Sequence, residues 1–129
     1  MRAAVVAVLL SGVAVTTACT PEELAWWKAK VEYAHQQQWP CPDAAPLLET
    51  FGLPQHFHNV MWRESTCSPW AVSPDGAIGV LQIMPFWLAE LCPLGIACTP
   101  ADLHDPVRNV AAAAYVYRVQ GPSAWSQTW

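Results

Sequence analysis

The chain has 129 residues, a formal net charge of −4 and a hydrophobic content of 53%. This length leaves room for one domain. The six Lys and Arg residues, against ten Asp and Glu residues, form no basic patch. The composition therefore argues against nucleic acid as a partner.

Residues 1–18 have the pattern of a secretory signal peptide. Arg2 provides a short positive start, an apolar run follows to Val15, and Thr16-Thr17-Ala18 is a small-residue cleavage site. A permanent membrane span is the alternative, but a helix from Ala3 to Ala18 reaches only about 24 Å of a hydrocarbon core about 30 Å thick. We therefore expect an exported protein whose first mature residue is Cys19.

The cysteine count fits export. There are five cysteines: Cys19, Cys41, Cys67, Cys92 and Cys98. An odd count leaves one unpaired, and Cys19 stands where bacterial lipoproteins carry a lipid-modified cysteine. Lipidation would tether the protein to a membrane through Cys19, and an unmodified Cys19 is the alternative.

The other four cysteines can form two disulfides. Cys92 and Cys98 enclose a short loop, and Cys41 and Cys67 would then tie the segment before the first core helix to the end of a later helix. Buried free thiols are the alternative, and the sequence alone leaves the connectivity open. No CxxC or Cys/His spacing indicates a zinc site, and we expect no metal or cofactor.

The first predicted helix covers residues 21–38. Thr20 is a suitable N-cap and Pro21 suits the first turn. This helix either docks on the core or is a spacer from a lipid anchor, and docking is favoured because Trp26 and Trp27 would be costly to expose. We therefore divide the mature chain into an N-terminal helix and linker (19–42) and a globular domain (43–129).

Two more helices are predicted at the start of the globular domain, over residues 44–51 and 55–66. In the second, Phe57, Val60, Met61 and Glu64 fall at i, i+3, i+4 and i+7, so Glu64 shares the apolar face. A carboxyl on a buried face loses solvation, so we expect its pKa to rise and a proton to remain available near neutral pH.

A turn and two further helices complete the prediction. Pro74-Asp75-Gly76, followed by alternating Ile78, Val80 and Ile83, predicts a small β-hairpin. A short helix over 85–91 and a loop over 92–100 come next. The last helix begins at Asp105-Pro106, a cap with a first-turn proline, and ends at Gly121-Pro122.

The stretch from Glu64 to Pro85 resembles a known signature. Its pieces are Glu64-Ser65, then Ser-Pro-Asp-Gly-Ala over 73–77, then Gly-Val-Leu-Gln-Ile-Met-Pro over 79–85. These motifs are similar to those of the lytic transglycosylases of the SLT type, which belong to the lysozyme-like superfamily. The resemblance implies a compact, mostly helical α+β domain with a small β-hairpin beside the catalytic helix.

The resemblance also implies an activity. The family cleaves the β-1,4 bond between N-acetylmuramic acid and N-acetylglucosamine in peptidoglycan, and here Glu64 matches its general acid and base. The C6 hydroxyl of the muramic acid then closes a 1,6-anhydro ring, and no water is consumed. A lysozyme-type hydrolase of the same bond and a non-catalytic peptidoglycan-binding module are the alternatives. A hydrolase needs a second carboxylate, and Asp75 is a candidate, although a Pro-Asp-Gly turn explains it on backbone grounds.

The remaining candidates surround Glu64. By resemblance, Gln82 lines the glycan groove, and the alternative is that it braces the hairpin. Ser65 holds either Glu64 or the hairpin, and Tyr115 either approaches the substrate or packs in the core. His56 and His58, at i and i+2 on a helix, point apart and suggest no metal pair.

The C-terminal end departs from the family pattern. The usual Ala-Tyr-Asn-Ala-Gly segment is missing after Gly121, and Trp125 and Trp129 are candidates to close the site in its place. We expect a monomer of the cell envelope or extracellular space whose partner is the peptidoglycan glycan strand.

Overall fold

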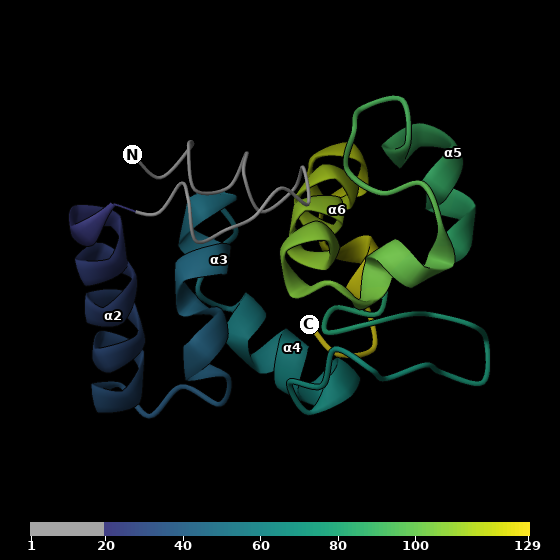
Figure 1. Ribbon diagram of the computed structural model, residues 1–129. Coiled ribbons are helices and arrows are strands. Elements are labelled where there is room, and N and C mark those ends of the chain that lie inside the picture. The colour runs from purple at the N-terminus through teal and green to yellow at the C-terminus, as the bar shows by residue number, and fades with distance from the viewer. Residues whose placement is uncertain (1–19) are drawn as a thin grey trace.

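The computed structural model describes residues 20–129, and the predicted signal peptide and Cys19 lie outside this part of the chain. In chain order the helices are α2 (Pro21–Gln36), η2 (Pro42–Ala44), α3 (Ala45–Thr50), α4 (Phe57–Ser65), η3 (Pro85–Trp87), α5 (Leu88–Leu91), η4 (Pro100–His104), α6 (Pro106–Gln120) and η5 (Gly121–Trp125). Helix α2 stands beside α3, while α4 leads from α3 toward the loop below α6 (Figure 1). The described part is thus mostly helical, as expected.

Helix α2 begins with the predicted cap. The Thr20 hydroxyl accepts a hydrogen bond from the Glu23 amide, and the Glu23 carboxylate accepts one from the Thr20 amide. The helix packs on η2 and α3, with Ala34 fully buried and Lys30 paired to Glu49 at 2.9 Å. The docking alternative is therefore the one observed, although Leu24 remains about half exposed.

The core lies between α4, the loop over 77–83, and α6. Phe57, Val60 and Met61 on α4 are fully buried, as are Leu81 in the loop and Val110 on α6. Alanines over 111–113 are also buried, which lets α6 approach its neighbours closely. The predicted start of this helix is confirmed, because the Asp105 carboxylate accepts from the Val107 amide at 2.9 Å.

The predicted β-hairpin forms no strand among residues 20–129. Two isolated antiparallel bridges, Val72 with Ile78 and Ile78 with Ile83, stand in its place. The backbone turns too often for extended runs, because Gly76, Gly79 and Gln82 all adopt positive φ. The loop is therefore a series of turns with few backbone hydrogen bonds of the kind that join β-strands.

Two disulfides form, and they have the pairing that the sequence analysis considered but left open. Cys41 and Cys67 join with a Cα–Cα distance of 5.7 Å, and Cys92 and Cys98 join at 4.3 Å. The first links the segment after α2 to the chain just beyond α4. The second closes the loop after α5.

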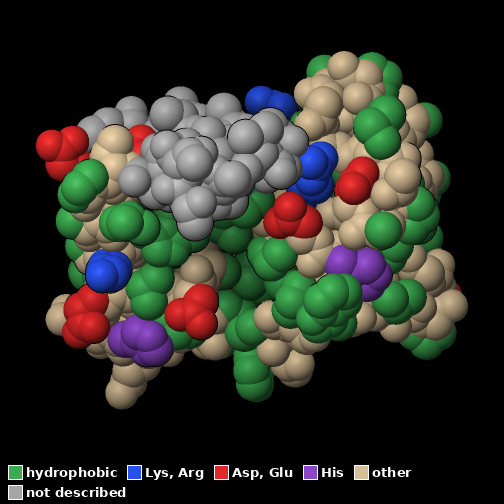
Figure 2. All heavy atoms as spheres, viewed as in Figure 1, with side chains coloured by type: hydrophobic (Ala, Val, Ile, Leu, Met, Phe, Trp, Pro, Cys, Tyr) green, Lys and Arg blue, Asp and Glu red, His purple; other side chains and the backbone are tan. Residues whose placement is uncertain are grey.

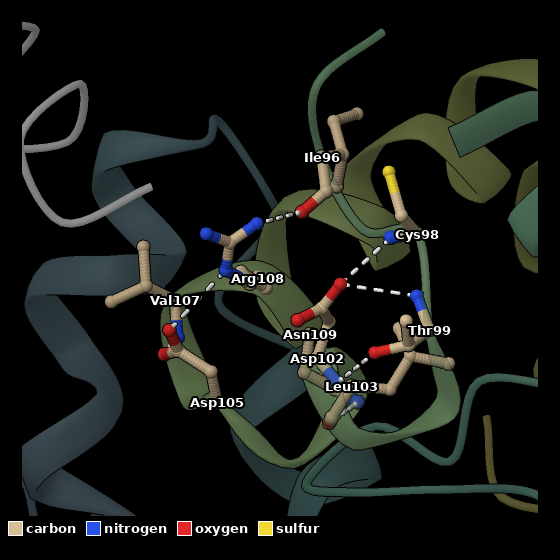
Figure 3. A network of polar contacts seen from close by, with 9 residues as sticks. All are labelled: Ile96, Cys98, Thr99, Asp102, Leu103, Asp105, Val107, Arg108 and Asn109. Carbon is tan, nitrogen blue, oxygen red and sulfur yellow. Dashed lines mark hydrogen bonds and ion pairs between the residues drawn. The ribbon is translucent and has the colours of Figure 1, made fainter. Parts of the chain in front are cut away.

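Polar contacts fix the chain between this second disulfide and α6 (Figure 3). The Asp102 carboxylate accepts from the amides of Cys98 and Thr99 at 2.8 and 3.0 Å. The Cys98 amide is the main cause of a lowered pKa for Asp102, and burial opposes it. Arg108 donates to the Ile96 carbonyl at 3.1 Å and lies 3.7 Å from the Asp105 carboxylate.

The surface agrees with the composition. On the face drawn in Figure 2 the few Lys and Arg side chains form no continuous patch, and Asp and Glu side chains lie near them. Among residues 20–129, no helix has the length and hydrophobicity that crossing a membrane requires.

Candidate active site

Glu64 lies in the last turn of α4. Thr66, two residues later, adopts a left-handed conformation with φ 52° and ends the helix. The Glu64 side chain is partly buried. Its Oε1 accepts a hydrogen bond from the Thr128 hydroxyl at 2.6 Å, so a residue far along the chain meets the predicted acid.

Ser65 fastens the end of α4 to the loop that follows. Its side chain is buried, and its hydroxyl lies 2.8 Å from the Val80 carbonyl and 3.1 Å from the Met61 carbonyl. The single hydroxyl proton is shared between these two acceptors. Of the two roles expected for Ser65, this geometry supports fastening the loop.

Gln82 occupies a tight bend in the same loop. Its φ is 52°, and its amide nitrogen donates to the carbonyls of Gly79 and Ala71 at 2.9 and 3.2 Å. The donors therefore brace the loop, while the partly exposed side chain also lines a surface hollow. These bonds support the bracing role considered for Gln82, and its role in a glycan groove stays a prediction.

This hollow has a volume of about 120 Å³. Gln82, Phe86, Trp87, Gln120 and Trp125 are among its lining residues. Phe86 is 67% exposed, so an aromatic face is open at the rim. Two larger hollows, of about 300 and 360 Å³, lie beside the Cys41–Cys67 disulfide and between α2 and α3. Glu64 is not among the lining residues of any of these three hollows.

Asn109 holds the loop from α6, and sequence patterns did not single it out. Its side chain is fully buried. Its carbonyl oxygen accepts from the Leu81 amide at 2.9 Å, and its nitrogen donates to the carbonyls of Ile78 and Leu103 at 2.8 Å each. An asparagine directly before the apolar run over residues 110–114 is the available signal, because buried polar groups need partners.

The C-terminal segment returns to α4. Trp125 is buried and donates from its indole to the Leu81 carbonyl at 2.9 Å. Trp129 stacks on Tyr117 with 5.9 Å between ring centroids and meets Phe57 edge-on at 5.3 Å. The expected tryptophans do lie near α4, yet the direct contact to Glu64 comes from Thr128.

Tyr115 lies on α6 beside α5. Its ring meets Trp87 edge-on at 6.1 Å, and Arg118 lies 6.0 Å over it. The pKa of Tyr115 is raised, mainly by partial burial and to a smaller extent by the hydrogen bond and negative charge of the Glu90 carboxylate. This position gives Tyr115 a packing role toward α5.

Asp75, the candidate second carboxylate, is exposed at the turn between Ser73 and Ala77. The turn is closed by the Gly76 amide donating to the Ser73 carbonyl at 2.9 Å. An exposed carboxylate at a turn needs no catalytic explanation.

His56, the N-cap residue of α4, and His58, in its first turn, face different surroundings. His58 is buried and packs against Trp39 with centroids 4.2 Å apart, whereas His56 packs against Trp129 at 4.6 Å. Within residues 20–129, no three His, Cys, Asp or Glu side chains are grouped so that they could hold a metal ion.

A protein-family model described as the Transglycosylase SLT domain matches residues 50–120. The chain belongs to the transglycosylase SLT family. Comparison with curated proteins finds no match, and comparison with solved structures finds none either. Membership indicates a lysozyme-like, peptidoglycan-cleaving enzyme that acts in the cell envelope, and the two disulfides are in keeping with an exported protein.

The family model matches only the middle part of this transglycosylase SLT chain. It runs from the end of α3 to the end of α6 and contains Glu64, Ser65 and Gln82. It leaves out α2 and the segment from Gly121 onward. Thr128, which contacts Glu64, therefore comes from outside the matched region.

Proposed function

We propose that the protein is a lytic transglycosylase that cleaves the β-1,4 bond between N-acetylmuramic acid and N-acetylglucosamine in peptidoglycan. Glu64 is the general acid and then the general base. The observation that carries this proposal is the position of Glu64 within the matched family segment. It is a partly buried carboxylic acid at the end of α4, and its neighbour Ser65 bonds to Val80 in the loop that carries Gln82.

The reaction needs one carboxylic acid in two protonation states. Protonated Glu64 donates its proton to the glycosidic oxygen as the bond from that oxygen to C1 of the muramic acid breaks. The 2-acetamido group assists at C1. The Glu64 carboxylate then takes the proton of the C6 hydroxyl, whose oxygen bonds to C1, and the acid is regenerated without water.

The surroundings of Glu64 support the non-hydrolytic route. A hydrolase of the usual type places a second carboxylate about 5 to 10 Å from the acid. The sequence candidate for that role, Asp75, is exposed on a turn. A separate feature, the hollow lined by Gln82, Phe86 and Trp87, to which Glu64 does not contribute, offers aromatic faces on which sugar rings stack.

Digestion of purified peptidoglycan sacculi tests the proposal. The mature protein should release muropeptides that are lighter than lysozyme products by one water, and Glu64→Gln should release none. Products identical in mass to those of lysozyme would instead support a hydrolase. Binding to sacculi without any release would leave a non-catalytic peptidoglycan-binding module.

A further inference from the structure

Thr128 is the residue whose side chain meets the predicted acid. Its hydroxyl lies 2.6 Å from Oε1 of Glu64, within the range of a charge-assisted O–H···O⁻ bond. The two residues are 64 positions apart in the chain, and both are partly buried. Thr128 also lies outside the segment that the family model matches.

The backbone around Thr128 is held from two sides. Its amide donates to the Trp125 carbonyl at 2.9 Å, and Trp125 is itself buried and bonded to Leu81. Arg63, the neighbour of Glu64 on α4, donates to the Thr128 carbonyl at 3.0 Å. The hydroxyl is therefore fixed relative to the same helix turn that carries the acid.

The direction of the hydrogen bond has a chemical consequence. A threonine hydroxyl has one proton, and its other acceptor within reach, the Trp125 carbonyl, is more distant at 3.4 Å. When the hydroxyl donates to Oε1, the carboxyl proton is favoured on Oε2, because a protonated Oε1 would be a poorer acceptor for the hydroxyl. Oε2 is then the oxygen that carries a proton to a substrate.

We propose that Thr128 is a positioning residue that orients the Glu64 carboxyl, so that Oε2 delivers and recovers the proton during glycan cleavage. This inference rests on the proposed function. In this role the C-terminal segment completes the site with a hydroxyl, and Arg63 and Trp129 hold the segment in place. A purely structural contact, which only anchors the end of the chain, is the competing explanation.

Three substitutions separate these explanations. Thr128→Val keeps the shape and removes the donor, Thr128→Ser keeps the donor, and Gln127→Ala changes an exposed neighbour. The kcat and KM of each variant are measured on soluble peptidoglycan strands, and thermal unfolding is recorded in parallel. A misoriented acid destabilises the transition state but not the bound substrate. Thr128→Val should therefore lower kcat and leave KM unchanged.

We expect Thr128→Val to lose roughly 10-fold or more in kcat, the scale of one hydrogen bond to a charged group. Thr128→Ser should restore most of kcat, and Gln127→Ala should behave as wild type. Wild-type kcat in Thr128→Val would overturn the inference, as would an equal loss in Thr128→Ser. So would a loss confined to KM or explained by unfolding.

The design also distinguishes this inference from the proposed function. An inactive wild type, or a Glu64→Gln variant as active as wild type, would overturn both. Active wild type, inactive Glu64→Gln and fully active Thr128→Val would overturn only the role of Thr128.

Discussion

The side chain of Asn109 on α6 accepts a hydrogen bond from the backbone amide of Leu81, next to Gln82. With its two further bonds to the carbonyls of Ile78 and Leu103, it connects the loop of the candidate site to the longest helix of the matched domain. The loop has few ladder bonds of its own, so we infer that Asn109 keeps Gln82 in place.

Replacing Asn109 by Ala should lower the free energy of unfolding by about 3 kcal/mol, because it leaves a buried amide and buried carbonyls without partners. Urea denaturation measures this change. Asn59→Ala, at an exposed position of α4, is the matched control and should stay within about 0.5 kcal/mol of wild type. Equal effects of the two substitutions would contradict the role of Asn109.

Gly79 is required where the loop passes closest to α6. A Cβ at this position would lie 2.3 Å from Asn109 Nδ2 and 2.4 Å from the Leu103 carbonyl oxygen, and φ is +81°. Gly79→Ala should therefore destabilise the protein by several kcal/mol, roughly the sum of steric overlap and backbone strain. Thermal unfolding and sacculus digestion should both show the loss.

Gly95→Ala is the control for this substitution. Gly95 has a similar φ of +74° but nothing within 4 Å of an added Cβ. The Gly95→Ala substitution should lower the free energy of unfolding by only about 1 kcal/mol, which is the cost of placing an alanine at a positive φ. A comparable loss at both positions would show that backbone conformation, and not the contact with Asn109, explains the need for glycine.

The helices and their ends could be predicted from local chemistry. Thr20 and Asp105 cap as expected, and Gly121 follows the last residue of α6. The hairpin could not be predicted correctly, because Gln82 adopts a positive φ that its residue type does not suggest. What holds Gln82 there is a set of bonds to Gly79 and Ala71, visible only in three dimensions.

The candidate site was predicted in part. The helical spacing correctly placed Phe57, Val60 and Met61 in the core, whereas Glu64, at i+7, is only partly buried. Thr128 could not be found in this way, since 64 residues separate it from Glu64 and a threonine near a chain end has no distinctive pattern. Tertiary packing of Trp125 and Trp129, rather than local propensity, brings it to α4.

The two disulfides should contribute unequally to stability. The Cys41–Cys67 bond spans 26 residues and the Cys92–Cys98 bond spans 6. Loop entropy alone gives about 3.5 kcal/mol for the first and about 2 kcal/mol for the second. Double replacement by Ala, pair by pair, followed by thermal unfolding, should reproduce this order. A larger loss from the Cys92–Cys98 pair would contradict it.

His58 should make the protein less stable in mild acid. Burial, only partly offset by the Cys41 backbone, lowers the pKa of His58 from 6.5 to about 4. Between these values the unfolded chain binds a proton that the folded protein does not, so stability falls as the pH drops from about 6.5 and the loss is complete near pH 4. The expected contribution is on the order of 2 kcal/mol, allowing for partial screening by solvent.

Two histidine variants separate the effect of His58 on the free energy of unfolding from the effect of the carboxylates, which also bind protons in acid. His58→Gln should flatten the fall in unfolding free energy between pH 6.5 and 4, even if it lowers stability at neutral pH. His35→Gln replaces an exposed histidine and should keep the wild-type slope. If His58→Gln kept that slope too, burial of a neutral imidazole against Trp39 would not be the source of the acid sensitivity, and the carboxylates would have to account for it.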